Sequence, residues 1–414
     1  MAISYAQAVS VAIPIFVGMI AVEFIADRVQ HRGQYRLADS INSLSCGMVN
    51  TGIKIFFGFI GLFFYQWVLR NLAPVQLPVS HWGTWLFTFF AYDFCYYWQH
   101  RCGHTVGLFW AAHVVHHQSE EFNLTTALRQ TGTGAFVDWV FYLPLALCGV
   151  PILVVGGVGV VQLFYQFWPH TQKIGRMGVF DRWIQTPSNH RVHHAQNDIY
   201  VDRNYVGVFA IWDRLFGTFQ EELDAEPCIY GIRGQLKSWN PLWANFHYWW
   251  AMLRDCWYAR SWADKVRVWF APPGWRPTDV AARFPKPAYD PKRDFAKYDP
   301  PRPLGLSIYC GVQFLVLMAA NSHFLTVGPN AYYFLFLLAS LVSVGGVMEG
   351  RREFVMAEGV RLAIVAAGVW WTGQWFGGAQ GALLVNGIAA FAIASLLGLW
   401  AAVRTAGEPA RQPA

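Results

Sequence analysis

The sequence predicts an all-α fold: a polytopic bundle of transmembrane helices that carries a histidine-rich cap in the cytosol and an additional C-terminal transmembrane bundle. Three observations carry this prediction. The 414 residues are 55% hydrophobic and only 14% charged, which is too apolar for an ordinary soluble protein. Apolar windows of membrane-spanning length recur along the chain. Histidines cluster directly after some of these windows, which indicates polar chemistry at the ends of membrane helices.

A hydrocarbon core of about 30 Å requires about 20 mostly apolar residues per helix. The windows that meet this length are residues 7–27, 46–69, 82–98, 305–325, 331–348, 359–376 and 380–402. A longer apolar stretch, 134–168, contains Pro144 and Pro151 and would measure roughly 50 Å as one straight helix. We therefore expect a bent or re-entrant hairpin there, which returns the chain to the side it left.

The distribution of arginines predicts the orientation. The first connection between windows contains Arg28, Arg32 and Arg36, whereas the second contains only Arg70. Because positive residues favour the cytoplasmic side, the first connection is predicted to be cytoplasmic. Counting crossings places further segments on the same side: 99–133, 169–304, Arg351, Arg352 and Arg404. The net charge of +6 suits a surface of anionic lipid and requires no nucleic acid.

Composition divides the chain into a catalytic region, 1–300, and C-terminal transmembrane helices, 301–414, joined by a proline-rich linker. Within the first region, "SWNPLWANFHYWW" predicts an interfacial helix with Trp239, Trp243, Trp249 and Trp250 at the headgroup level. The seven cysteines form no CxxC pair and are expected to be reduced, buried side chains. The first apolar run lacks a cleavage site, so we expect it to be a true first helix.

Three sets of histidines share helical spacing. His100 and His104 are four residues apart, and each of the other sets repeats the HxxHH pattern, so every set lies on one helical face. Those other sets are His113, His116 and His117, and His190, His193 and His194. His170, in "FWPHT", is a ninth candidate. The remaining histidines (His31, His81, His247 and His323) are expected to be hydrogen-bonded structural residues.

These nine histidines predict a metal centre. Neutral imidazole is a common ligand for iron, zinc and copper, and a helix face presents several imidazoles toward one point. Eight or nine ligands are too many for one ion and suit two, and no cysteine is placed for a structural zinc site. Burying so many unpaired imidazoles beside a bilayer would otherwise cost several kcal/mol. We therefore predict a di-metal centre with open coordination positions.

The order HxxxH, HxxHH, HxxHH, interleaved with membrane helices, resembles the fatty acid hydroxylase and sterol desaturase superfamily of membrane di-iron enzymes. Longer blocks resemble its alkylglycerol monooxygenase branch over about residues 82–220. They are "DFCYYWQHRCGH", "FWAAHVVHHQSEEFNLTTALRQ", "WPHT", "TPSNHRVHH" and "DRNYVGVFAIWDRLFGTF". Two positions depart from that branch's pattern: Thr105 stands where it carries an acidic residue, and Asn189 precedes His190 where it tends to carry histidine.

The resemblance implies a monooxygenase that uses two Fe²⁺ ions, O2 and external electrons to hydroxylate a C–H bond of a lipid, with an alkylglycerol as one candidate substrate. The electron donor would be a reductase, a ferredoxin, a cytochrome or a reduced pterin, and Thr105 argues against the pterin. One alternative is a sterol, carotenoid or fatty-acyl hydroxylase or desaturase with the same site. A more distant alternative is a non-enzymatic protein that binds or transports metal.

Polar residues beside the histidines are candidates for supporting roles. Asp93 lies two helical turns before His100 on the same face and is predicted to orient that imidazole. Glu120 and Glu121 are predicted to orient His117 or to relay protons. Further candidates are Asn123 and Arg129, expected to line the site, and Asp181 and Arg182, expected to organise the loop before the third histidine set. Glu120, Asp93 and Asn123 are the predicted catalytic residues besides the metal ligands.

Overall fold

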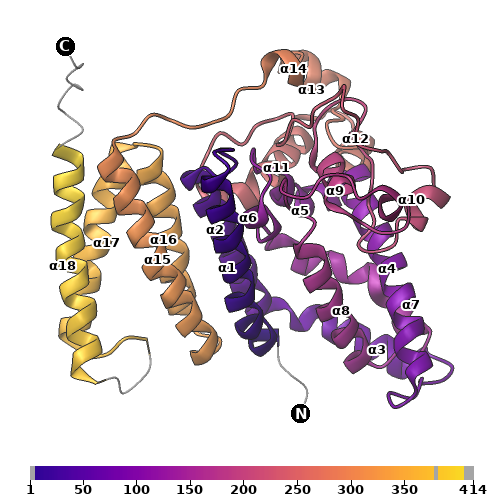
Figure 1. The fold of residues 1–414 in the computed structure, drawn as a ribbon, viewed down its shortest axis with the longest axis horizontal. Coiled ribbons are helices and arrows are strands. Elements are labelled where there is room, and N and C mark those ends of the chain that lie inside the picture. Colours follow the sequence, from indigo (N-terminus) through magenta and orange to yellow (C-terminus); the bar gives the residue numbers. More distant parts are fainter. Residues whose placement is uncertain (1–4, 377–380, 405–414) are drawn as a thin grey trace.

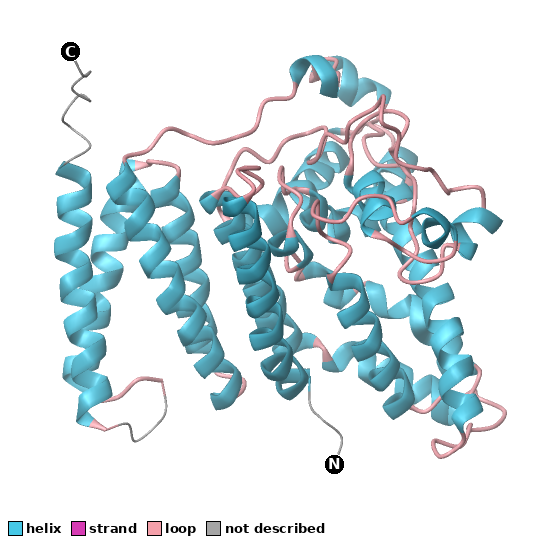
Figure 2. Cartoon of the chain, in the orientation of Figure 1, coloured by secondary structure: helices cyan, strands magenta, loops and turns pink. Residues whose placement is uncertain are grey.

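The computed structural model describes residues 5–376 and 381–404 (Figure 1). Within these ranges the chain consists of helices and connecting loops, with two isolated β-bridges and no strand (Figure 2). The predicted all-α class is therefore confirmed. All seven cysteines are free, as expected, but only Cys46, Cys95 and Cys310 are buried, and Cys148 is exposed, so the prediction of burial is wrong for the others.

The N-terminal half begins with four long helices. They are α1 (Tyr5–Val29), α2 (Leu37–Phe57), α3 (Phe59–Asn71) and α4 (Trp82–Thr105). The predicted membrane window 46–69 covers parts of two helices, because α2 begins at Leu37 and meets α3 at a 48° bend. Gly58 lies at the bend, where a Cβ atom would approach the carbonyl oxygen of Lys54 to 2.5 Å. The bend therefore depends on a residue without a side chain.

Four helices of the described chain are long and apolar enough to cross a membrane, and the bent pair α2–α3 makes a fifth if it counts as one span. The four are α15 (Leu304–Val327), α16 (Ala331–Met348), α17 (Arg352–Thr372) and α18 (Ala382–Arg404). They form the predicted C-terminal bundle (Figure 1). The windows 7–27 and 82–98 lie in α1 and α4, and α4, which ends in the polar stretch "QHRCGHT", is not among these spans.

The stretch 134–168 forms the predicted bent hairpin. Its helical segments are η1 (Thr133–Phe136), η2 (Asp138–Tyr142), α7 (Leu143–Leu147) and α8 (Ile152–Phe167). The chain reverses between α7 and α8, where Gly149 has φ +78° and its carbonyl oxygen accepts a hydrogen bond from the backbone N–H of Leu77. Leu77 lies in the connection between α3 and α4. The tip of the hairpin therefore packs on the end of the bundle opposite the cap.

Replacing Gly149 with alanine is expected to destabilise this hairpin. A left-handed conformation costs a residue with a Cβ atom about 1–2 kcal/mol, and the added atom would lie 1.9 Å from the carbonyl oxygen of Val75. Thermal unfolding in one detergent measures the effect. Gly156→Ala in α8 is the matched control, because nothing lies within 4 Å of its added Cβ atom and alanine favours a helix by up to about 1 kcal/mol. Equal unfolding temperatures for both variants would contradict the prediction.

A cap of short helices and loops covers one end of α2, α4 and α8 (Figure 1). Its helices include α5 (Gly107–His117), α6 (Leu124–Ala127), η3 (Gly178–Arg182), α9 (Pro187–His194), α10 (Ile211–Leu215), α11 (Pro241–Tyr258) and α12 (Trp262–Phe270). The linker after α12 contains only the short helices α13 (Thr278–Arg283) and α14 (Pro291–Asp294) before α15. The proline-rich segment is therefore mostly extended, as predicted.

Segments that were predicted to share one side of the membrane meet at the capped end. Arg36, just before α2, donates to Glu121 at 2.5 Å and to Glu120 at 3.4 Å. Glu349, between α16 and α17, accepts hydrogen bonds from the side chain of Ser238 and the backbone N–H of Trp239. The first connection, the cap and the α16–α17 connection therefore lie together. The assignment of this end to the cytoplasm stays a prediction.

Two cap helices present exposed apolar faces. On α11, Trp243, Trp250 and Trp257 are 41%, 60% and 80% exposed, and Phe246 and Leu253 lie on the same face. Trp262 at the start of α12 is 81% exposed. Spacing of three and four residues puts such a stripe on one side of a helix, which is the pattern of an interfacial helix. The headgroup prediction fails for Trp239, which precedes the helix and is buried in the hydrophobic core, and for Trp249, which is partly buried against Ala111, Met252 and Val268.

The largest hydrophobic core joins the two halves of the chain. It contains Ala38, Ile41 and Val49 from α2 and Trp239 from the cap, together with buried residues of α15, α16, α17 and α18. A second core fills the space between α3, α4, α7 and α8 and includes Tyr65, Cys95 and Val154. The division into 1–300 and 301–414 stays a prediction, and the packing shows that both parts rest on α2.

Candidate metal centre

Three helices carry the histidine sets. His100 and His104 lie on the last turns of α4, His113, His116 and His117 lie on α5, and the third set occupies α9. α9 is short but well defined at its start, because the Thr186 side chain caps it by accepting from the backbone N–H of Asn189, and Pro187 occupies its first position. His170 follows the C-terminus of α8. All nine candidate histidines are brought to the same region beneath the cap.

The nine histidines form two groups. In each group, one ligand atom per residue lies within 4.8 Å of the ligand atoms of all the others. The five-histidine group is His100, His104, His113, His117 and His193. The four-histidine group is His116, His170, His190 and His194. The groups adjoin, since the rings of His117 and His194 stack with their centroids 4.4 Å apart.

Helical periodicity explains how the motifs divide between the groups. In α5, His113 and His117 are one turn apart and face the five-histidine group, whereas His116 points to the other group. In α9, His190 and His194 face the four-histidine group, and His193 points to the first. Each HxxHH motif therefore supplies both groups, and its two adjacent histidines serve different ones.

Backbone carbonyls fix the protonation of four of the rings. The Nδ1 atoms of His100 and His193 lie 2.7 Å and 2.9 Å from the carbonyl oxygens of Tyr205 and Arg203. Those of His116 and His170 lie 3.0 Å and 2.9 Å from the carbonyl oxygens of Arg129 and Gln166. A carbonyl oxygen only accepts, so each Nδ1 carries the proton and each Nε2 presents a lone pair toward its group.

These lone pairs lack protein donors. Within the described chain, Nε2 of His100 and Nε2 of His193 are buried and have no hydrogen-bond partner. Nε2 of His170 lies 2.8 Å from Nε2 of His190 and 3.3 Å from Nε2 of His116. Two lone pairs at such distances repel each other unless a cation lies between them. The donor set therefore fits a metal ion in each group.

Gln185 completes this pattern for His190. Its amide nitrogen lies 3.0 Å from Nδ1 of His190, while its amide oxygen is buried without a partner in the described chain. Rotating the terminal amide of Gln185 by a half-turn exchanges its nitrogen and oxygen. The oxygen then accepts from Nδ1–H of His190 and is no longer buried without a partner. Nε2 of His190 then also presents a lone pair to the four-histidine group.

Burial keeps the nine imidazoles neutral. It lowers the pKa of His116 to about 4. Burial, together with the charge that neighbouring imidazoles would carry, lowers the pKa of each of the other eight well below 6.5. Only the neutral ring has the lone pair that a metal needs, so the fold holds the histidines in their ligand form at neutral pH.

The metal-free protein is expected to lose stability as the pH falls below 6.5. An unfolded chain protonates its histidines near pH 6.5, whereas in the folded chain their pKa values are lower, so the unfolded state binds more protons in this range. Stability is therefore complete above pH 6.5 and decreases toward pH 4. Thermal unfolding of the chelator-treated protein between about pH 7.5 and pH 5 measures it. An unfolding temperature independent of pH would refute the lowered pKa values.

A loop after α9 holds the rings of the five-histidine group. Two buried carboxylates anchor it: Asp213 accepts from the backbone N–H groups of Tyr205 and Val206 at 2.9 Å and 3.2 Å. Asp93 accepts from the backbone N–H groups of Val208 and Phe209 at 2.8 Å and 3.0 Å. The loop residues 203 and 205 thus keep their carbonyl oxygens against His193 and His100.

The prediction that Asp93 orients His100 directly is wrong. Nδ1 of His100 is bound to the Tyr205 carbonyl, and Asp93 instead grips the loop that carries this carbonyl. Sequence spacing placed Asp93 on the correct face of α4, but it could not show that the loop lies between the two side chains. Asp93 is therefore a positioning residue that acts through the backbone of 205–209.

Comparison with known proteins agrees with this site. The fatty acid hydroxylase family profile matches residues 85–218, a range that contains all nine histidines and the loop after α9. The alkylglycerol monooxygenase of Homo sapiens is 32% identical over 357 residues, which cover 84% of this chain and 80% of the relative. The chain belongs to the alkylglycerol monooxygenase family. No solved structure matches it.

Other members of the alkylglycerol monooxygenase family give the same result. The alkylglycerol monooxygenase of Danio rerio is 32% identical over 376 residues, covering 86% of this chain and 81% of the relative. A more distant relative, the fatty acid hydroxylase vlmA of Lecanicillium sp, is 26% identical over 196 residues, covering 39% of this chain and 51% of the relative. The resemblance inferred from the histidine motifs is confirmed.

Glu120 and Glu121 do not contact the histidine groups of this alkylglycerol monooxygenase family member. Glu121 accepts from Arg36 and from Lys297 at 2.7 Å, and Glu120 accepts from the backbone N–H of Tyr298 at 2.6 Å. The prediction that they orient His117 or relay its protons is therefore wrong. They are buried at the junction of the α1–α2 connection, the cap and the linker, where they neutralise cations of distant segments.

Asn123 and Arg129 support the cap from behind the site. Asn123 caps α6 by accepting from the backbone N–H of Thr125, and its amide donates to the carbonyl oxygen of Gln34, so the expectation that its side chain lines the site is wrong. The fully buried Arg129 donates to the carbonyl oxygen of Val115 on α5, and its own carbonyl oxygen accepts from His116. Its contribution to the site is therefore through its backbone.

Asp181 organises the start of α9, as predicted. Its carboxylate accepts from the Thr186 hydroxyl at 2.5 Å and from the backbone N–H of Met177 at 2.8 Å. Its carbonyl oxygen accepts from the side chain of Asn189, one residue before His190. The carbonyl of Arg182 accepts from Arg214 on α10. Asn189, at a position where the alkylglycerol monooxygenase pattern tends to carry histidine, therefore holds the loop before α9 in place.

Sequence reasoning missed the residues that orient the ligands. They are Gln166, Gln185, Arg203, Tyr205 and Asp213. Three of them act through backbone carbonyl oxygens. Every residue type has such an oxygen, so the sequence does not mark these positions. The block "DRNYVGVFAIWD" directly after the third histidine set was the available signal for Arg203, Tyr205 and Asp213.

Proposed function

We propose that this chain is a membrane-bound di-iron monooxygenase that hydroxylates a C–H bond of an alkylglycerol with O2 and electrons from an external donor. The observation that carries the proposal is the pair of all-histidine groups, whose ligand atoms converge and in which Nε2 of His100 and Nε2 of His193 are buried without a hydrogen-bond partner in the described chain. The relatives that match most of the chain are named alkylglycerol monooxygenases, which supports the choice of substrate.

The chemistry of the donor set favours iron. The groups consist of neutral imidazoles without a thiolate, which suits Fe²⁺ and leaves the ions with high positive charge. When bound, such an iron pair supplies the oxidising power that inserts one oxygen atom of O2 into a C–H bond. The chain contributes the ligands, their orientation and the exclusion of water. We assign these tasks to residues 1–300.

Carbonyl-held imidazoles keep the ligand geometry rigid, because a ring whose Nδ1–H is hydrogen-bonded cannot rotate without breaking that bond. Aromatic side chains close the site. The fully buried Phe122 stacks on His170, and the Trp110 ring lies against His104 with centroids 5.1 Å apart. These rings cover part of each histidine group, and limiting water there would protect a strong oxidant from side reactions.

The proposed substrate explains the position of the site at the ends of membrane helices. The alkyl chain of an ether lipid lies in the bilayer, and its ether oxygen lies near the headgroup level, at the depth where α4 and α8 end. Hydroxylation of the carbon next to that oxygen consumes O2, two electrons and two protons and releases water. The resulting hemiacetal collapses to an aldehyde and a free glycerol. We place this end of the bundle on the cytoplasmic side.

The second candidate is a hydroxylase or desaturase of another lipid with the same site, in line with the similarity to a fatty acid hydroxylase over 196 residues and the fatty acid hydroxylase profile match to residues 85–218. The nature of the product separates the two. An ether lipid yields aldehyde and glycerol, a hydroxylated acyl chain gains one oxygen, and a desaturated chain loses two hydrogens.

The test uses purified protein in nanodiscs with 1-O-hexadecylglycerol under ¹⁸O2. We expect about two iron ions per chain. Mass spectrometry should find hexadecanal and glycerol. The ¹⁸O atom should be found in the aldehyde when the aldehyde is trapped as it forms. Parallel reactions receive a ferredoxin with its reductase or a reduced pterin. The Thr105 hydroxyl donates to the Arg101 carbonyl and offers no charge to a pterin, so we expect the protein donor to suffice. Protein without bound iron, or iron-loaded protein that leaves the ether intact with every donor, would exclude this function.

A further inference from the structure

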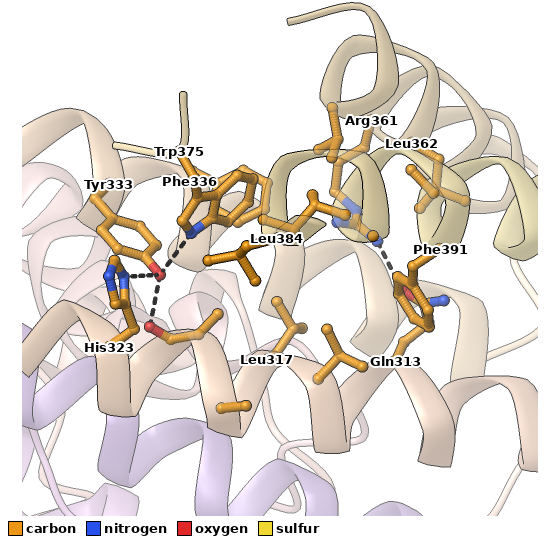
Figure 3. A pocket seen from close by; sticks show the side chains of 17 residues that line it. Gln313, Leu317, His323, Tyr333, Phe336, Arg361, Leu362, Trp375, Leu384 and Phe391 are labelled. Atoms are coloured by element: carbon orange, nitrogen blue, oxygen red, sulfur yellow. Dashed lines mark hydrogen bonds between the residues drawn. The ribbon is translucent and has the colours of Figure 1, made fainter. Parts of the chain in front are cut away.

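The C-terminal bundle contains a cavity of about 340 Å³ (Figure 3), and this bundle lies apart from α4, α5 and α9, which carry the histidine motifs (Figure 1). Its lining comes from α15, α16, α17, α18 and Trp375. Gln313 and His323 mark its two ends on α15, about 15 Å apart at about 1.5 Å per residue. Between these ends the lining consists mostly of aliphatic and aromatic side chains, such as Val316, Leu317 and Phe391, which suit an alkyl chain. The volume is within the range of about 300–1,000 Å³ usual for ligand sites.

The end of the cavity at Arg361 offers no free charge. Arg361 donates to both carboxylate oxygens of Glu358, at 2.8 Å and 2.6 Å, and to the amide oxygen of Gln313 at 3.1 Å. The amide nitrogen of Gln313 in turn donates to Ser395 at 2.8 Å. These groups satisfy one another, so this end of the cavity does not call for a polar ligand group.

The opposite end presents one unused hydrogen-bond acceptor. The Tyr333 hydroxyl lies 2.7 Å from the carbonyl oxygen of Ala320, which only accepts, and 3.0 Å from Nε1 of Trp375, which only donates. The hydroxyl proton is therefore used, and Nδ1 of His323, 3.2 Å away, must donate to the same oxygen. Nε2 of His323 then carries a lone pair, and it has no hydrogen-bond partner in the described part of the chain. Figure 3 shows His323 and Tyr333 together at this end.

The cavity opens toward the lipid-facing side of the bundle. Val316 on α15 and Leu384 on α18 line it and are 39% and 51% exposed. His323 lies in the last turns of α15, and Trp370 and Trp371 at the corresponding end of α17 are 82% and 89% exposed. Exposed tryptophans at helix ends mark the membrane–water interface. The acceptor is thus at headgroup level, and the apolar part of the cavity extends into the hydrocarbon region.

We propose that this cavity binds one single-chain lipid with a hydroxyl head group. The hydroxyl donates to Nε2 of His323, and the alkyl chain follows α15 past Leu317 toward Arg361. The proposal concerns binding in the C-terminal helices and is independent of turnover at the histidine groups.

The experiment uses the full chain in phosphatidylcholine nanodiscs and a dodecan-1-ol analogue with a diazirine in its chain. After irradiation, mass spectrometry maps the labelled peptides. We expect the label on α15 and α18. Excess dodecan-1-ol should compete for this labelling about 3- to 10-fold more efficiently than dodecyl methyl ether, which has no hydroxyl to donate. A ratio of this size corresponds to the contribution of one hydrogen bond. His323→Phe should reduce the ratio to about one. Competition by 1-O-dodecylglycerol, compared with dodecan-1-ol, distinguishes a glyceryl ether from a long-chain alcohol as the ligand.

Two matched glycine variants keep the result interpretable. Gly387 lines the cavity and nothing lies within 4 Å of an added Cβ atom, so Gly387→Leu fills the cavity and should abolish the labelling. Gly368 on α17 has the same open surroundings but does not line the cavity, so Gly368→Leu should label like the original protein. Equal competition by the methyl ether in the original protein, or undiminished labelling of Gly387→Leu, would overturn the proposal. Either result would mean that the probe reaches the helices from the bulk lipid and not from the cavity.

Discussion

Replacing His170 with alanine is expected to cost the protein one of its two iron ions and nearly all of its turnover. His170 lies outside the three sequence motifs, yet its Nε2 is 2.8 Å from that of His190, and it is one of only four residues in its group. Without His170 the group has three imidazoles and no further histidine that could replace the lost ligand. We expect iron to fall from about two to about one per chain and activity to fall by more than about 100-fold, beyond the 10- to 100-fold typical of supporting partners.

Metal analysis and turnover of the same preparation measure this effect. His247→Ala is the control, because His247 lies in α11 outside both groups and contacts Gln118 and the Ala244 carbonyl. It should retain both ions. If His170→Ala kept two ions and full activity, the four-histidine group would not be a metal site, and the di-iron proposal would fail with it.

Asp213→Asn is expected to weaken only one of the two metal sites. Asp213 accepts from the backbone N–H groups of Tyr205 and Val206 and from the Thr218 hydroxyl at 2.6 Å. An amide has one acceptor oxygen instead of two, so one buried donor loses its partner at a cost of about 1–3 kcal/mol. The Tyr205 carbonyl then shifts from His100, and we expect the metal affinity of the five-histidine group to fall about 10- to 100-fold.

Cobalt titration followed by optical spectra distinguishes this role from simple destabilisation. The expected result is two binding phases of which one weakens and the other keeps its affinity, because Asp213 holds the Tyr205 carbonyl, which binds His100 and none of the four-histidine group. Asp224→Asn is the control, since Asp224 pairs with Arg176 at the surface. An equal loss in both phases would mean that Asp213 acts on the stability of the whole cap and not through His100.

The sequence alone determined the membrane-length helices of the C-terminal bundle and the histidines that gather in the two groups. Runs of apolar residues set the lengths of α15, α16, α17 and α18, since a helix is the structure that satisfies its own backbone in hydrocarbon. Spacings of three and four residues placed His100 with His104, and the HxxHH motifs, on single helical faces. The hairpin at 134–168 was predictable because its length exceeds one crossing and its prolines interrupt a helix. These are local properties of consecutive residues.

Only the tertiary structure decided how the histidines divide and what holds them. Whether His116 or His117 joins a given group depends on how α4, α5 and α9 pack, and packing brings together residues more than seventy positions apart. Likewise, Asp93 and Glu120 were expected at the ligands because they are near in sequence, but Asp93 binds the loop at 208–209 and Glu120 binds the linker at Tyr298. The orienting atoms are backbone carbonyls at Arg129, Arg203 and Tyr205, which every residue type possesses. Spacing along one helix fixes the direction of a side chain, whereas its partner across the fold is fixed only when distant segments meet.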